Sequence, residues 1–127
     1  MPDEIIPPAA RALIAERIDS VPELEAVLLF RTEARRTWTP EEAGQRLYVS
    51  TTVASHVLAE LADRGFFARE AEAYRYAPAS PELAAAVDEL ASAYSRHLVA
   101  VTNLIHSKPS QSVRDFANAF RLRRPKP

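Results

Sequence analysis

The stretch from residue 39 to residue 76 constrains the fold most, because it predicts two short helices followed by two strands. Residues 39–42 (Thr-Pro-Glu-Glu) form a capping box, with a cap hydroxyl, proline at the first helical position and an acid three residues after the cap. Ser50 or Thr51 can cap a second helix, which ends at Gly65, the residue best suited to a left-handed C-terminal cap. Side chains alternate as in β-strands over residues 66–70 and 73–77, which are joined by a tight connection at residues 71–72. This order presents one helix for insertion into a groove and flanks it with a β-ribbon.

Composition predicts a single helix-rich domain. The chain has 127 residues, only two glycines and no cysteine, so we expect a mainly α fold with a small antiparallel hairpin and no disulfides. Trp38 lies in an extended link that could add a third strand, and it is predicted to be core together with Phe66 and Phe67. The expected organisation is N-terminal helices that complete the core (1–34), the two short helices and hairpin (35–78), a long helix (80–108), and a short amphipathic helix with a basic tail (109–127).

Residues 80–108 predict one long helix with a single apolar stripe. Ser80 and Pro81 begin it, and no glycine or proline follows before Pro109, so the helix would extend about 40 Å at 1.5 Å per residue. Its apolar residues are spaced by three or four throughout, and a stripe of this length exceeds what a small domain needs for its own core. We therefore expect a homodimer interface along Leu83, Val87, Leu90, Tyr94, Leu98, Val101 and Ile105.

Catalysis has little support in the sequence. The three histidines lack metal-ligand spacing, and neither a glycine-rich phosphate loop nor a Ser–His–carboxylate set is evident. We expect no enzyme activity, no cofactor and no metal site. The amino terminus lacks the basic start and apolar run of a signal peptide, and no apolar run approaches the roughly 20 residues of a membrane span. These features predict a cytoplasmic protein that has no membrane partner.

The outer face of the second short helix is the candidate nucleic-acid contact. If its aliphatic residues are buried, helical spacing exposes Thr51, Thr52, Ser55 and His56. Hydroxyls bond to phosphates or base edges, threonine methyls meet a thymine methyl, and the imidazole can donate to a guanine or a phosphate. The alternative interpretation is a solvated face on a helix that is packed for stability.

Four arginines are candidate phosphate contacts. Arg69 and Arg75 flank the hairpin turn, where they could approach a phosphate strand or a minor groove; the alternative is a charged pair beside acids on an exposed ribbon. Arg35 and Arg36 could clamp backbone phosphates or lie in a solvated loop. The net charge is −1 and the basic residues collect in segment 108–127, so the overall electrostatic case for nucleic acid is weak.

With these residues assembled, the segment resembles the winged helix-turn-helix superfamily of bacterial transcription regulators. The resemblance does not distinguish between MarR-like, IclR-like and related subfamilies. The resemblance implies a helix-turn-helix with a β-wing and a long C-terminal dimerisation helix, in which helix 51–64 enters the major groove. It assigns DNA contact to Thr51, Thr52, Ser55 and His56. The matching pattern covers roughly a third of the chain: Thr39-Pro40-Glu41-Glu42-Ala43, Leu47, Ser50-Thr51-Thr52, Ala54-Ser55-His56-Val57-Leu58, Glu60-Leu61, Arg64-Gly65-Phe66-Phe67 and Tyr74-Arg75-Tyr76.

The leading hypothesis is a homodimeric, sequence-specific regulator of transcription that binds double-stranded DNA. The alternative is a winged-helix adaptor that docks another protein in a signalling or transcription complex without reading DNA. An acidic first third, an uncharged reading face and a possible protein contact through Phe116, Phe120 and the basic tail favour the adaptor.

Overall fold

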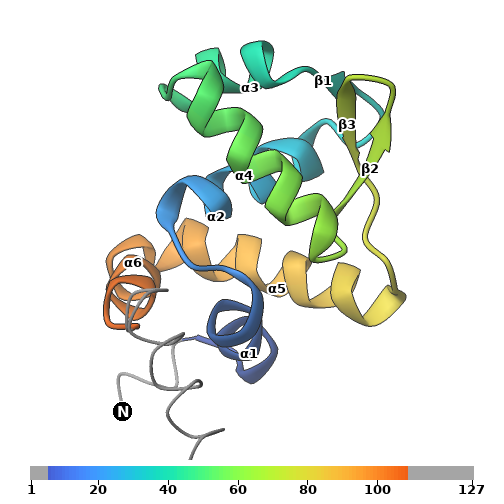
Figure 1. The fold of residues 1–127 in the computed structure, drawn as a ribbon. Helices are drawn as coiled ribbons and strands as arrows, with labels where there is room; N and C mark the ends of the chain where they lie inside the picture. The colour runs from blue at the N-terminus through green and yellow to red at the C-terminus, as the bar shows by residue number, and fades with distance from the viewer. Residues whose placement is uncertain (1–5, 109–127) are drawn as a thin grey trace, which may run out of the picture.

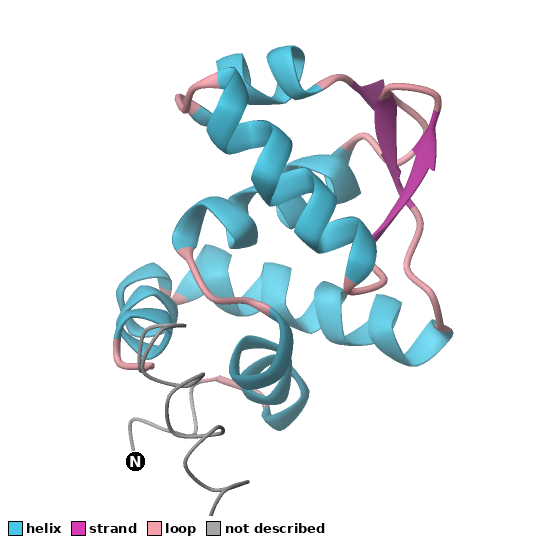
Figure 2. Ribbon diagram, viewed as in Figure 1, coloured by secondary structure: helices cyan, strands magenta, loops and turns pink. Residues whose placement is uncertain are grey.

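The computed structural model describes residues 6–108, and within them the protein is mainly helical with one small antiparallel sheet (Figure 1 and Figure 2). The fold class predicted from composition and periodicity is confirmed at this level. The predictions for residues 1–5 and 109–127, including those for Phe116, Phe120 and the basic tail, lie outside the described residues. The elements in chain order are α1 (Pro8–Arg17), α2 (Val21–Thr32), β1 (Thr37–Trp38), α3 (Pro40–Leu47), α4 (Thr51–Asp63), β2 (Phe67–Glu70), β3 (Ala73–Tyr76), α5 (Pro81–Arg96) and α6 (Leu98–His106).

Helix α2 lies at the centre of the molecule, between two groups of elements. On one side it packs against α3, α4 and β3, and on the other side it packs against α5 (Figure 1). Helix α1 packs on α5 and α6, although these helices are far from it in the sequence. The pair α3–α4 and the sheet therefore form one layer, and α1, α5 and α6 form the other.

The two short helices begin and end where local signals predict. The Thr39 hydroxyl accepts the Glu42 N–H at 3.2 Å and the Glu42 carboxylate accepts the Thr39 N–H at 2.9 Å, which completes the capping box. Of the two possible caps of α4, Ser50 is used: its hydroxyl accepts the Val53 N–H at 3.1 Å. Gly65 follows α4 with a φ of 95°, the left-handed conformation predicted for it.

Strand β3 is the centre of the sheet, with β1 on one side and β2 on the other (Figure 2). Trp38 pairs with Tyr74, so the link before α3 does add the predicted third strand. Trp38 and Phe67 share the inner face of the sheet and stack on Phe30, with ring centroids 5.3 and 4.4 Å away. Both rings are buried, which confirms that the aromatic residues under the hairpin are core.

The predicted single helix over residues 80–108 is wrong, because it is divided at His97. Helix α5 ends at Arg96 and α6 begins at Leu98, with His97 in a non-helical conformation of φ −137° and ψ 54°. In an unbroken helix, the last nine residues would extend α5 by roughly 14 Å along its own axis. The break instead turns α6 so that it packs against α1 (Figure 1). Within residues 6–108 no helix is both long and apolar enough to cross a membrane.

The apolar stripe predicted as a dimer interface is largely covered by the chain itself. The inference that the stripe exceeds what a small domain needs for its own core is wrong, because α1 and the bend at His97 close the core over it. Leu98 is the exception, with 53% of its surface exposed. A homodimer remains a prediction, but most of the stripe is not free to form it. The residues that pack in or against the chain's own core are Leu83, Val87, Leu90, Tyr94, Val101 and Ile105.

Candidate nucleic-acid interface

Helix α4 buries one face and leaves the opposite face uncovered, as predicted. Ala54, Leu58 and Leu61 are buried, and α4 packs against α2, α3 and β2. On the other side the side chains line a shallow surface hollow together with the half-buried Ala59, and no described residue covers them. The four exposed residues, called the polar face of α4 below, are Thr51, Thr52, Ser55 and His56.

The turn that leads into α4 is tight, and it depends on a glycine in α3. The Val49 N–H donates to the Gly44 carbonyl at 3.0 Å, and a Cβ on Gly44 would lie only 2.9 Å from the Val49 oxygen. Tyr48 lies in this turn with a left-handed φ of 59°, and its side chain is 95% exposed. The sequence predicted a break here, but the exposed Tyr48 was missed. A large aromatic residue at a position where the helix must end is the signal that could have identified it.

An ion-pair cluster around Arg64 fixes the C-terminal end of α4. The Arg64 guanidinium lies 3.3 Å from Asp19, 2.9 Å from Glu23 and 3.1 Å from Glu60. It also donates to the Arg17 carbonyl at 2.9 Å, and Arg17 donates back to the Arg64 carbonyl at 2.7 Å. Glu23 is buried in this cluster, and desolvation by burial raises its pKa despite hydrogen bonds and the nearby Arg64 charge, which lower it. The cluster therefore locks α4 to the junction between α1 and α2.

The two hairpin arginines lie on opposite faces of the sheet, and each pairs with an acid. Arg69 is opposite Tyr74 on the inner face, and its guanidinium lies 3.6 Å from Asp63, the last residue of α4. Arg75, one residue along β3 from Tyr74, is on the outer face, where its guanidinium hydrogen-bonds the Glu70 carboxylate. The two arginines therefore do not form one positive patch. Exposed pairs of this kind contribute only about 0–1 kcal/mol, so each arginine can exchange its acid for another anion.

The adjacent arginines before β1 have different surroundings. The Arg36 guanidinium lies 3.6 Å above the centre of the Trp38 ring and 3.6 Å from Glu33. Arg46 of α3 lies 3.5 Å from the same Glu33 carboxylate, and sequence reasoning missed it as a candidate. Arg35 is exposed and has no ion pair or hydrogen bond with the residues that the structure describes. The predicted clamp therefore separates into one paired arginine and one that points into solvent.

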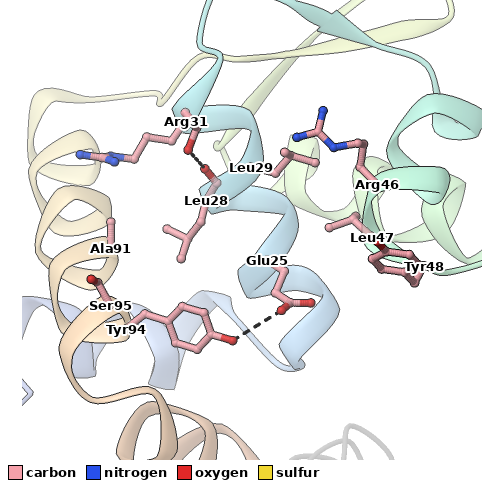
Figure 3. A pocket seen from close by; sticks show the side chains of 11 residues that line it. Glu25, Leu28, Leu29, Arg31, Arg46, Leu47, Tyr48, Ala91, Tyr94 and Ser95 are labelled. Atoms are coloured by element: carbon pink, nitrogen blue, oxygen red, sulfur yellow. Dashed lines mark hydrogen bonds between the residues drawn. The ribbon is translucent and has the colours of Figure 1, made fainter.

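A surface groove of about 500 Å³, which the sequence did not predict, lies between α2, α3 and α5, next to the turn that contains Tyr48 (Figure 3). Leucines form its apolar side, with Arg46 and Tyr48 at one end. At the other end the Tyr94 hydroxyl donates to Glu25 at 3.5 Å, and burial followed by the Glu25 charge raises the pKa of Tyr94. The leucines are Leu28, Leu29 and Leu47.

Within residues 6–108, no group of three or more histidine, cysteine, aspartate or glutamate side chains is arranged so that it could hold a metal ion. No protein-family model, curated protein or solved structure matches this chain. The site must therefore be interpreted from its own geometry: a helix fixed at its C-terminal end by the Arg64 cluster, an uncovered polar face, and arginines on the hairpin and before β1, most of them paired with acids.

Proposed function

We propose that this protein binds duplex DNA as a winged helix-turn-helix and regulates transcription as a homodimer. Helices α3 and α4 would be the helix pair, α4 the reading helix, and the β2–β3 hairpin the wing. The observation that carries the proposal is the polar face of α4, which is exposed on a helix held at both ends. The Gly44 turn fixes its start, and the Arg64 cluster fixes its end.

The chemistry of the polar face suits base recognition more than strong affinity. Two threonines, a serine and a histidine supply short donors, acceptors and methyl groups, which can contact base edges in a major groove. Each well-formed base contact contributes about 1–3 kcal/mol of discrimination. Because these side chains carry no fixed positive charge, affinity for phosphates must come from the arginines around α4. Those with an acidic partner must release it on binding.

The test is selection of genomic fragments by the purified protein, with competitor DNA and a salt series. We expect enrichment of one sequence class, and a log affinity that falls by roughly 0.9 per contacted phosphate for each log unit of salt. Thr52→Ala and His56→Ala should change the preferred sequence, because each removes a base contact. Ser92→Ala, which removes an exposed hydroxyl from α5, is the matched control and should leave the preferred DNA sequence unchanged. Failure to enrich any sequence over the competitor would rule out sequence-specific reading.

A protein adaptor is the second candidate, and one observation favours it. Leu98 and Val99 at the start of α6 are 53% and 68% exposed, adjacent aliphatic side chains of the kind that protein interfaces bury. For this function we expect Leu98→Asp to abolish capture of a specific partner while Thr52→Ala leaves it intact. A partner that is also lost when the chain is truncated at Pro109 would assign part of the contact to the C-terminal segment.

A further inference from the structure

Tyr48 occupies a position that its side chain does not favour. It ends α3 with φ 59° and ψ 41°, the left-handed conformation in which glycine and asparagine are the usual residues. Most other residues with a side chain are strained there. The ring is 95% exposed, and it has no hydrogen bond, ion pair or ring contact among residues 6–108. Neither the turn nor the core therefore gains stability from this tyrosine.

The place of Tyr48 suggests what the exposed ring does. It lies in the turn directly before α4, and the Ser50 cap fixes the short segment between it and the first helical residue, Thr51. Arg46, which precedes it on α3, is also half exposed, with 52% of its side chain accessible. Tyr48 thus places a large flat surface and a hydroxyl donor three residues before Thr51, the first residue of the polar face, and at the end of the groove between α2, α3 and α5.

We propose that Tyr48 contacts the DNA backbone and so positions the polar face of α4 over the base edges. This contact rests on the proposed DNA-binding function and deepens it. The phenol hydroxyl donates to a phosphate oxygen, and the ring covers the neighbouring sugar; tyrosine is among the side chains that make such positioning contacts. The contact exists only in the complex, so its gain cannot be seen in the free protein. That explains why a strained residue occupies the turn where glycine would fit better.

The test measures stability and DNA affinity in the same full-length variants, with the duplex selected by the wild-type protein as the probe. Tyr48→Gly and Tyr48→Asn should unfold at the same or a higher urea concentration, because both residues fit the left-handed turn. They should nevertheless bind the duplex about ten-fold more weakly, since both the hydrogen bond to a charged group and the contact of the ring with the sugar are lost. Tyr48→Phe, which lacks only the hydroxyl, should fall between them and the wild type. The salt dependence should not change, because an uncharged side chain releases no counterion.

Two control variants separate strain from contact. Ala71→Gly relieves the other left-handed non-glycine residue, at φ 58° in the hairpin turn, and removes only a methyl group, so it calibrates the gain in stability. Val99→Ala removes an exposed apolar side chain from α6 and should leave affinity unchanged within about two-fold.

The possible outcomes distinguish this contact from the function on which it rests. If the glycine and asparagine variants bind as tightly as the wild type, the Tyr48 contact is overturned and DNA reading by α4 stands. A marked loss of stability in both variants would overturn it as well, because the ring would then be part of the turn's own packing. A wild-type protein that selects no duplex overturns the contact and the proposed function together.

Discussion

At the scale of single residues, Gly44 decides how closely α3 and α4 can join. Alanine is normally preferred to glycine within a helix, by about 1 kcal/mol. Here the added Cβ would meet the Val49 oxygen at 2.9 Å, and that oxygen belongs to the backbone of a tight turn and cannot simply rotate away. We expect Gly44→Ala to lower the free energy of unfolding by about 1–3 kcal/mol, as overpacking in a fixed site does. Urea unfolding followed by the fluorescence of Trp38, the chain's one tryptophan, measures this.

Gln45→Ala is the control for Gly44, because Gln45 is the next residue of the same helix and its side chain is exposed. It should change stability by no more than about 0.5 kcal/mol. Equal stability of the Gly44→Ala protein and the wild type would show that the turn adjusts at little cost, and that the approach of Val49 does not need a glycine.

Glu23 predicts a pH dependence whose sign follows from its burial. Its pKa in the folded protein is raised above the reference value of 4.5, so between these two values the folded state binds a proton that the unfolded state does not. The contribution of Glu23 to the free energy of unfolding must therefore decrease as the pH rises through that window. Glu23→Gln removes this term. In urea titrations across the window, the stability of the variant relative to the wild type should rise with pH; a flat or falling difference would contradict the raised pKa.

At the scale of elements, the hairpin's acids should limit DNA affinity under the proposed function. Asp63 and Glu70 hold Arg69 and Arg75 in exposed ion pairs. Neutralising either acid, as Asp63→Asn or Glu70→Gln, should raise affinity for the selected duplex by about two- to five-fold, the size expected for an exposed pair. The slope of log affinity against log salt concentration should become steeper by up to roughly 0.9 for each arginine that gains a phosphate contact. Fluorescence anisotropy at several salt concentrations measures both quantities.

The matched control for the hairpin is Asp88→Asn, which frees Arg31 from a similar ion pair of 2.8 Å on α2 and α5. It removes the same charge from an ion pair that joins α2 to α5 and includes no residue of α4 or the hairpin. If Asp88→Asn increases affinity as much as the hairpin variants, only the net charge of the protein matters, and the wing has no special part in binding.

At the scale of the whole molecule, the bend at His97 makes the apolar stripe of α5 and α6 part of the chain's own core. Leu90→Ala should therefore lower the free energy of unfolding by about 2–5 kcal/mol, the usual cost of a cavity at a buried leucine. This loss should not depend on protein concentration. Leu98→Ala, at the exposed position of the stripe, should cost little. Urea unfolding at two protein concentrations, with sedimentation for the oligomeric state, tests this: a concentration-dependent loss for Leu90→Ala would restore the stripe as a dimer interface.

The parts of the fold that could be predicted from the sequence depend on neighbours a few residues apart. The Thr39–Glu42 capping box, the left-handed Gly65 and the alternation of the hairpin strands are local features, so their energies are settled within a turn or a strand pair. The exposure of the α4 polar face also followed, because helical spacing alone separates it from Ala54, Leu58 and Leu61.

Tertiary structure decided what lies beside each of these elements. Arg64 meets Asp19 and Glu23 from more than 40 positions away, and Arg69 meets Asp63 across a turn, which no spacing rule predicts. The break at His97 has the same origin: helix periodicity favours continuing α5, but burial of Val101 and Ile105 against the rest of the core requires α6 to change direction. Local hydrogen bonds and dihedral preferences are written into short segments, whereas burial and charge pairing depend on where packing brings distant segments together.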